Sequence, residues 1–188
     1  MKYALSNICL FVFFLAVVSC ATDDVRQETS DTEIPNLTDS LGLHLTDYDK
    51  NIQALIQDPN GLIRGFSLGM DSELIKTKNS SLQKVDSSAT TYTYSSQLDA
   101  VEAADFTYQF ANKKVNKIEV VVYPENEYRQ GIYYRELKNY FSSKFKTKAT
   151  EETNSMTWAV PSQGLTIRLT KTGSKKFHDL QLVFEKLK

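Results

Sequence analysis

Cysteine is scarce in this chain of 188 residues, and both cysteines, Cys9 and Cys20, lie within its first twenty positions. The rest of the chain therefore lacks a thiol for a disulfide, a zinc–thiolate site or a cysteine nucleophile. Histidine is as rare, because His44 and His178 stand alone without a metal-binding spacing such as H-x-x-E-H. The sequence thus predicts no metal and no cofactor.

An excess of charge of either sign is also missing, since 22 lysines and arginines nearly cancel 23 aspartates and glutamates. Without a strong positive field, the chain is not drawn to the phosphate backbone of nucleic acids. Glycine is sparse at 7 residues, and no phosphate-binding glycine loop is present. Nucleic-acid and nucleotide partners are therefore not expected.

Only one long apolar run occurs, from Ile8 to Val18, and the acidic Asp23 and Asp24 follow it. A membrane-spanning helix usually needs about 20 apolar residues and basic residues on its retained side. A shorter run with acidic residues behind it is instead typical of a secretory signal peptide. We expect residues 1–19 to be that peptide.

The apolar run ends in Val17-Val18-Ser19-Cys20, in which a small residue precedes a cysteine. This tetrapeptide resembles the lipobox of bacterial lipoproteins. The resemblance implies cleavage before Cys20, attachment of acyl chains such as palmitate to Cys20, and a membrane partner reached through that lipid. The following Ala21-Thr22-Asp23-Asp24 is similar to the export signal of surface lipoproteins in Bacteroidota-type bacteria. It implies a place in the cell envelope, at the periplasmic or outer face of the outer membrane.

Residues 21–40 are acidic, with six aspartates and glutamates against Arg26 alone. So few large apolar side chains cannot offset the entropy of ordering, and the segment is predicted to be a disordered tether. Within it, Asp39-Ser40-Leu41 resembles a short O-glycosylation acceptor of the same bacterial group. Residues 41–188, which carry 20 basic and 17 acidic side chains, form the predicted domain.

The domain alternates between helical and strand patterns. Thr46 is placed to cap a short first helix, and longer helices are expected at about 69–80 and from Gly131 onward. Alternating apolar residues predict three strands after each longer helix, around 92–94, 106–110, 118–122, 156–160, 165–169 and 180–184. We therefore expect an α+β fold of two tandem helix-plus-three-strand units, about 62–124 and 125–188, with an antiparallel sheet.

This order of elements, with Phe66-Ser67-Leu68-Gly69-Met70 before the first long helix, resembles the β-lactamase-inhibitor-protein-like fold. It is also similar to small accessory lipoproteins of the outer-membrane assembly machine. The resemblance implies a binding fold that presents a sheet face or loops to a protein partner. No functional residue carries over from either group. We accordingly expect a non-catalytic protein-binding or scaffolding module, for assembly, inhibition or immunity.

An alternative function is a small serine hydrolase. Gly65-Phe66-Ser67-Leu68-Gly69 matches the G-x-S-x-G turn that exposes a nucleophile, and His178 is the histidine available as its base. Asp99 or Asp105 would then serve as the acid. Against this, the hydrolase fold needs parallel strands with alternating helices, whereas antiparallel strands are predicted here. Otherwise, Gly65 and Gly69 are turn and cap glycines.

Carboxylates offer a second route to catalysis, because a glycosidase needs only two of them at a suitable separation. The sequence selects no pair among its candidates, which are Glu102, Asp105, Glu119, Glu151 and Glu152. Distances between side chains decide this question, and the sequence does not contain them.

Aromatic side chains divide into core and surface candidates. Six lie on predicted apolar faces and are expected in the core: Tyr92, Tyr94, Tyr108, Tyr133, Tyr140 and Trp158. Tyr128 and Tyr134 fall off those faces and are candidates for binding a partner. Lys171, Lys175 and Lys176 flank a Thr-Gly-Ser turn and can contact an acidic partner or lipid head groups, or else are solvated charges of a hairpin tip.

Overall fold

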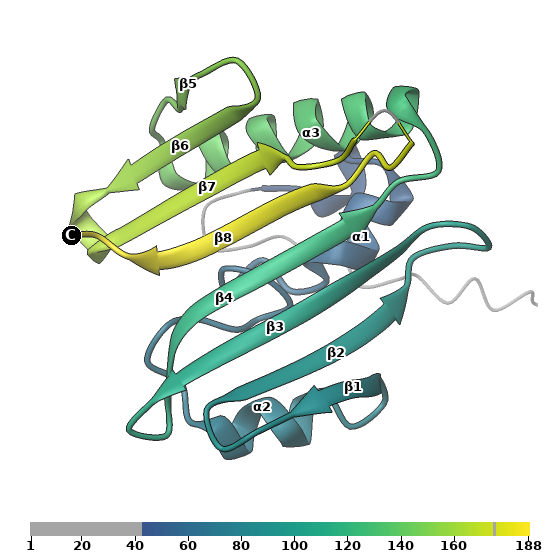
Figure 1. Cartoon of the computed structure of the whole chain (residues 1–188). Coiled ribbons are helices and arrows are strands. Elements are labelled where there is room, and N and C mark those ends of the chain that lie inside the picture. Colours follow the sequence, from purple (N-terminus) through teal and green to yellow (C-terminus); the bar gives the residue numbers. More distant parts are fainter. Residues whose placement is uncertain (1–42, 175) are drawn as a thin grey trace, which may run out of the picture. The chain divides into compact units, whose positions relative to one another are not determined.

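A computed structural model describes residues 43–174 and 176–188 of the chain (Figure 1). The expected signal peptide, the lipidated Cys20 and the tether to residue 40 lie outside the described residues, as does Lys175. Among the helices of the described residues, none combines the length and the apolar character that a membrane crossing requires.

One antiparallel sheet of eight strands forms the centre of the described structure, in the order β1-β2-β3-β4-β8-β7-β6-β5. Pairing of β4 with β8, in which Val120 lies opposite Leu182, joins the two halves of the sheet. The strands are β1 (Gln83–Ser87), β2 (Thr91–Gln97), β3 (Ala103–Ala111), β4 (Lys114–Tyr123), β5 (Thr150–Glu151), β6 (Ser155–Val160), β7 (Leu165–Lys171) and β8 (Leu180–Lys186).

Three α-helices cover one face of this sheet (Figure 1): α1 (Lys50–Ile56), α2 (Ser72–Lys78) and α3 (Glu127–Phe145). Two 3₁₀ turns, Leu45–Asp47 and Pro161–Gln163, complete the helical elements. From α3, Phe141 packs edge-on against Trp158 of β6 and Phe184 of β8, with ring centroids 5.8 and 5.6 Å apart. The core therefore lies between the helices and one face of the sheet.

The expected α+β fold of two tandem helix-plus-three-strand units is wrong, because the molecule is built mainly on one continuous eight-stranded sheet. The residue pattern did not predict β1 or β5. Every residue of both strands is exposed, so neither strand carries the alternation of apolar and polar residues that reveals a strand. Both lie at the edges of the sheet, where only one side is hydrogen-bonded to a neighbour.

Two helix starts also differ from expectation. The first helix begins at Lys50 rather than near Thr46, since the Asp49 carboxylate accepts a hydrogen bond from the amide of Asn51. The third begins at Glu127 rather than Gly131, because the side chain of Asn126 caps it by accepting from the amide of Arg129. The extra turn brings Tyr128 and Arg129 into the helix.

The expected core is confirmed residue by residue. The side chains of all six aromatic residues assigned to it are at most 8% exposed: Tyr92, Tyr94, Tyr108, Tyr133, Tyr140 and Trp158. In the central strands β3 and β4, buried residues alternate with partly exposed ones, as the apolar pattern predicts. Burial on one face only follows from helices that cover only that face.

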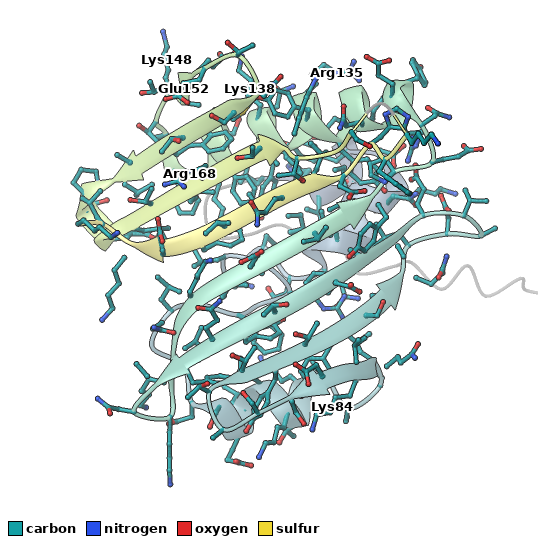
Figure 2. All side chains as sticks on the ribbon, viewed as in Figure 1. Lys84, Arg135, Lys138, Lys148, Glu152 and Arg168 are labelled. Atoms are coloured by element: carbon teal, nitrogen blue, oxygen red, sulfur yellow. The ribbon has the colours of Figure 1, made fainter. Side chains whose placement is uncertain are left out.

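The other face of the sheet is polar, and its charged side chains pair with one another. Lys117 lies 2.9 Å from Glu119, and Arg168, labelled in Figure 2, lies 3.5 Å from Glu185. The hydroxyls of Thr93 and Thr107 are 3.1 Å apart. These charged groups and hydroxyls of the polar face therefore already have partners within the sheet.

Candidate functional site

Three connections of the chain meet at one end of the sheet. Ala103 pairs with both Gln97 and Tyr123, and Val122 pairs with Leu180, so the strand ends on either side of these connections are aligned. We call this region, on the right-hand side of Figure 1, the loop end. It consists of residues 98–102, 124–126 and 172–179 apart from Lys175, with the adjoining Tyr123 and the first turn of α3.

Four large apolar side chains are exposed at the loop end. Val101 is 63% exposed, Tyr123 38%, Tyr128 77% and Phe177 65%. The other large apolar side chains exposed in the described residues are Leu74, Val85 and Leu187, which lie outside the loop end. Apolar side chains that cluster on a surface mark an interaction site more often than scattered ones do.

Tyr123 is held in place at the loop end. Its hydroxyl donates a hydrogen bond of 2.9 Å to the carboxylate of Asp105 on β3. Partial burial and this carboxylate together raise the pKa of Tyr123 to about 12, so the hydroxyl stays protonated at neutral pH. The ring is thus oriented before any partner arrives.

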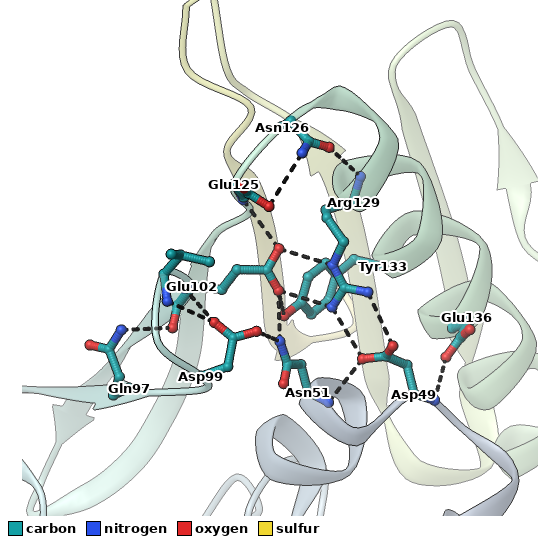
Figure 3. A network of polar contacts seen from close by, with 11 residues as sticks. Asp49, Asn51, Gln97, Asp99, Glu102, Glu125, Asn126, Arg129, Tyr133 and Glu136 are labelled. Carbon is teal, nitrogen blue, oxygen red and sulfur yellow. Dashed lines mark hydrogen bonds and ion pairs between the residues drawn. The ribbon is translucent and has the colours of Figure 1, made fainter.

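The loop end also contains a buried carboxylate (Figure 3). Glu102, in the β2–β3 connection, is 1% exposed and accepts hydrogen bonds from Nε and Nη2 of Arg129, at 3.0 and 2.9 Å. It also accepts from the Tyr133 hydroxyl at 2.8 Å, the Asn51 amide at 2.7 Å and the Glu125 backbone N–H at 3.2 Å. Five donors from three segments of the chain therefore converge on one side chain.

The hydrogen bonds extend from Glu102 to the neighbouring connections. Arg129 also binds Asp49 at the start of α1, with Nη1 3.1 Å from Oδ2 and Nη2 3.2 Å from Oδ1. Asp99 accepts from the backbone amides of Val101 and Glu102, at 2.9 and 2.8 Å. These contacts tie α1, the β2–β3 connection and α3 together, so the loop end is rigidly supported.

The charges in this network are mutually stabilised. Burial alone would raise the pKa of Glu102, but hydrogen bonds from Arg129 and the other donors outweigh it, and the pKa is lowered. The hydrogen bonds from Arg129 likewise lower the pKa of Asp49, and the two carboxylates raise the pKa of Arg129. At neutral pH all three groups are charged.

A polar cleft of about 510 Å³ opens at the loop end, between the start of α3, the β5–β6 turn and the β7–β8 connection. Gln130 on its wall is fixed by donating to the backbone oxygen of Asp179 at 3.3 Å. Lys171 is fixed as well, because its Nζ lies 4.7 Å from the centre of the Tyr134 ring. The lining residues are Glu127, Gln130, Asn154, Lys171, Gly173, Ser174 and His178.

The structure brings most of the predicted surface residues to this region. Tyr134 and Lys171 contact each other, Tyr128 follows the cleft residue Glu127, and Lys176 lies exposed in the β7–β8 connection. Lys175 lies outside the described residues. Lys171 lines the cleft and Tyr134 contacts it, whereas Tyr128 and Lys176 belong to the segments on either side of it. Whether these side chains bind a partner stays a prediction.

The residues of the alternative hydrolase are not brought together. Ser67 borders a hollow of about 110 Å³ with Leu165, the first residue of β7, whereas His178 lines the cleft with Lys171, the last residue of that strand. The two locations are about 20 Å apart along β7. Gly65 and Gly69 both have positive φ, at +73° and +86°, which their interpretation as turn glycines requires.

The candidate carboxylates for glycosidase chemistry are engaged in local contacts. Glu119 binds Lys117 and Gln181, at 2.9 and 2.7 Å, and Glu151 pairs with Lys138 at 2.7 Å. Asp105 and Glu102 hold Tyr123 and the buried network, and Glu152 accepts from the Ser155 hydroxyl. Among the described residues, no group of three or more histidines, cysteines, aspartates or glutamates is placed to hold a metal ion.

Sequence reasoning missed several residues of the site. Val101 and Phe177 lie in connections without periodicity, so no pattern identified them. Asn51 and Arg129 look like ordinary solvated residues of helices, and their partner Glu102 is 51 and 27 positions away. The signal that could have identified Arg129 is Asn126, a standard cap residue that places the arginine in the first turn.

The buried carboxylate predicts how stability depends on pH. Because the pKa of Glu102 is lowered by folding, its ionisation stabilises the fold above about pH 4.3, the value of an unfolded glutamate, and this stabilisation is lost as pH falls through the lower folded pKa. Glu102→Gln should therefore cost about 3 kcal/mol at pH 7 and flatten the loss of stability in acid.

Urea unfolding between about pH 3.5 and 7 measures both effects. Glu151→Gln is the matched control, because it removes a carboxylate from an exposed ion pair, and it should change stability by less than about 1 kcal/mol. If the free energy of unfolding varied with pH in the same way for the wild type and for Glu102→Gln, the role given to the buried charge would be contradicted.

Comparison of the chain with protein-family models, with curated proteins and with solved structures finds no match in any of the three. The resemblances to bacterial lipoproteins and to the β-lactamase-inhibitor-protein-like fold therefore stay predictions.

Proposed function

We propose that this protein is a cell-envelope lipoprotein, anchored through lipid on Cys20, whose domain binds a protein partner through the loop end. The role is non-catalytic and serves scaffolding, assembly, inhibition or immunity. The observation that carries the proposal is that Val101, Tyr123, Tyr128 and Phe177 are exposed at one end of the sheet, where the network around Glu102 holds the β2–β3 connection and the start of α3.

Physical chemistry favours such a surface for protein binding. Aromatic side chains dominate the binding energy of interfaces because they bury a large area while losing little conformational entropy. A surface that is already ordered binds more tightly, since less freedom is lost on association. The network around Glu102 supplies this order at the loop end.

The polar face of the sheet is the weaker candidate. Its charged residues Lys117 and Arg168 already have acidic partners within the sheet. A partner that docked there would have to replace these contacts with new ones of similar strength. The exposed apolar side chains of the loop end have no such competition.

The anchor and the site fit together in a simple arrangement. Lipid on Cys20 would hold the protein at a membrane, and the acidic segment up to residue 40 would let the domain reach beyond its surface. This arrangement would present the loop end to a partner at the membrane, as the non-catalytic role requires. The separation of Ser67 from His178 supports the same conclusion.

Site-specific photo-crosslinking in intact cells tests the docking surface. With p-benzoylphenylalanine at position 128 or 177, we expect an adduct of the same added mass from both positions, because one partner covers both. Position 85 on β1 is the matched control, since Val85 is 56% exposed but lies outside the loop end. Tyr128→Ala should reduce the adduct at position 177 at least tenfold. Equal adducts at 85 and 177 would contradict the proposal.

Substitution of the anchoring cysteine tests the location. Cys20→Ala should abolish labelling by palmitate and move the protein from the membrane fraction to the soluble fraction, because one residue carries the acyl chains. Cys9→Ala should change neither result, since Cys9 falls within the expected signal peptide. A Cys20→Ala protein that stays in membranes would show that the anchor is elsewhere.

A fluorophosphonate probe tests the rival hydrolase. We expect no labelling above that of Ser67→Ala, because His178, the base that this alternative requires, lies about 20 Å from Ser67 along β7. Labelling that disappears in Ser67→Ala and falls at least a hundredfold in His178→Ala would establish a nucleophile and overturn the non-catalytic role.

A further inference from the structure

We propose that the polar cleft of the loop end binds a carboxylate of the partner, supplied by an aspartate or glutamate next to a large apolar residue. The inference rests on the proposed function and specifies the chemistry of the partner. Its centre is Lys171, with His178, Asn154 and Ser174 around it.

Lys171 is poised for an anion. Its Nζ lies 4.7 Å from the centre of the Tyr134 ring, which orients the ammonium group without neutralising it. No carboxylate of the described residues lies within ion-pair distance of Lys171. Lys138 of α3, labelled in Figure 2, is by contrast 2.7 Å from a carboxylate oxygen of Glu151 on β5. A carboxylate of the partner would form with Lys171 the kind of ion pair that Glu151 forms with Lys138.

Further groups on the wall are free to bind the same ligand. The side chains of His178 and Asn154 make no hydrogen bond to other described residues, and both can donate. Ser174 adds a hydroxyl, which already accepts from the amide of Lys176 and keeps its own proton to donate. A carboxylate has about four acceptor positions, which these donors and Lys171 can share.

Glu127 favours one orientation of the bound ligand. It is the acidic residue of the cleft wall, at the opposite side from the β7–β8 connection, and it accepts hydrogen bonds only. A peptide supplies a backbone N–H for such an acceptor, whereas a free anion would be repelled by it. The cleft thus favours an acidic residue within a polypeptide over a simple ion.

Apolar contacts complete the specificity. Tyr128 follows the lining residue Glu127 in the chain and Phe177 precedes the lining residue His178, and both rings are exposed. A volume of about 510 Å³ accepts one acidic side chain and its backbone, while the neighbouring residue of the partner would lie against the rings. An anionic membrane is less suited, because Glu125 and Glu127 are exposed at the same end.

Selection from a random peptide library tests the inference without knowledge of the partner. The bait is the mature chain with Cys20→Ala, which carries no lipid. We expect selected peptides to share an aspartate or glutamate within two residues of an aromatic or large aliphatic residue. Lys171→Met should weaken their binding at least tenfold, and the matched control Lys138→Met less than twofold. Circular dichroism checks that both variants are folded.

The possible outcomes separate the two proposals. Selected peptides that lack an acidic residue, or that bind Lys171→Met unchanged while Tyr128→Ala abolishes binding, would overturn the carboxylate site and leave the docking surface intact. Peptides insensitive to Tyr128→Ala, Phe177→Ala and Lys171→Met alike would overturn both. Binding to phosphatidylglycerol vesicles, lost in Lys171→Met, with no peptide selected would assign the cleft to lipid head groups and refute the inference.

Discussion

The ion pair between Glu102 and Arg129 is the interaction on which the loop end depends. A carboxylate that is 1% exposed is tolerated only when its charge is matched, and here five donors match it. Those donors come from α1, the β4–α3 connection and α3, while Glu102 itself belongs to the β2–β3 connection. Satisfying one buried charge therefore fixes the relative positions of separate segments, and the exposed rings are carried by these segments and the β7–β8 connection that borders them.

Much of the central sheet could be predicted from sequence, because burial on one face imposes alternation. Phe106, Tyr108 and Phe110 identify β3 for this reason, and each is at most 6% exposed. The edge strands β1 and β5 have no buried face and so no alternation. Alternation of apolar and polar residues reflects burial of one face. A strand that is held only by backbone pairing has no buried face and therefore no such pattern. The predicted division into two three-strand units failed at these edges.

In the candidate site, too, some features depend on residues close together in the sequence and others on residues far apart in it. Tyr134 and Lys171 were recognisable singly, as residues outside the apolar faces, but their contact depends on α3 crossing behind β7. The motif around Ser67 shows the converse error. Its glycines do adopt the positive φ of a tight turn, yet His178 lies at the other end of β7. The motif alone predicted the local backbone conformation. The distance between Ser67 and His178, in contrast, depends on the register of the whole sheet.

Buried ion pairs contribute little net stability compared with well-packed apolar residues, so stability alone does not account for a network of this kind. What directed hydrogen bonds supply beyond apolar packing is a defined orientation. Arg129 binds Asp49 and Glu102 at once, and it thereby holds the first turn of α3, which carries the exposed Tyr128 and leads to Gln130 on the cleft wall. The network therefore serves to fix the positions of side chains that face solvent. A docking surface requires such fixed side chains, whereas a purely structural core does not.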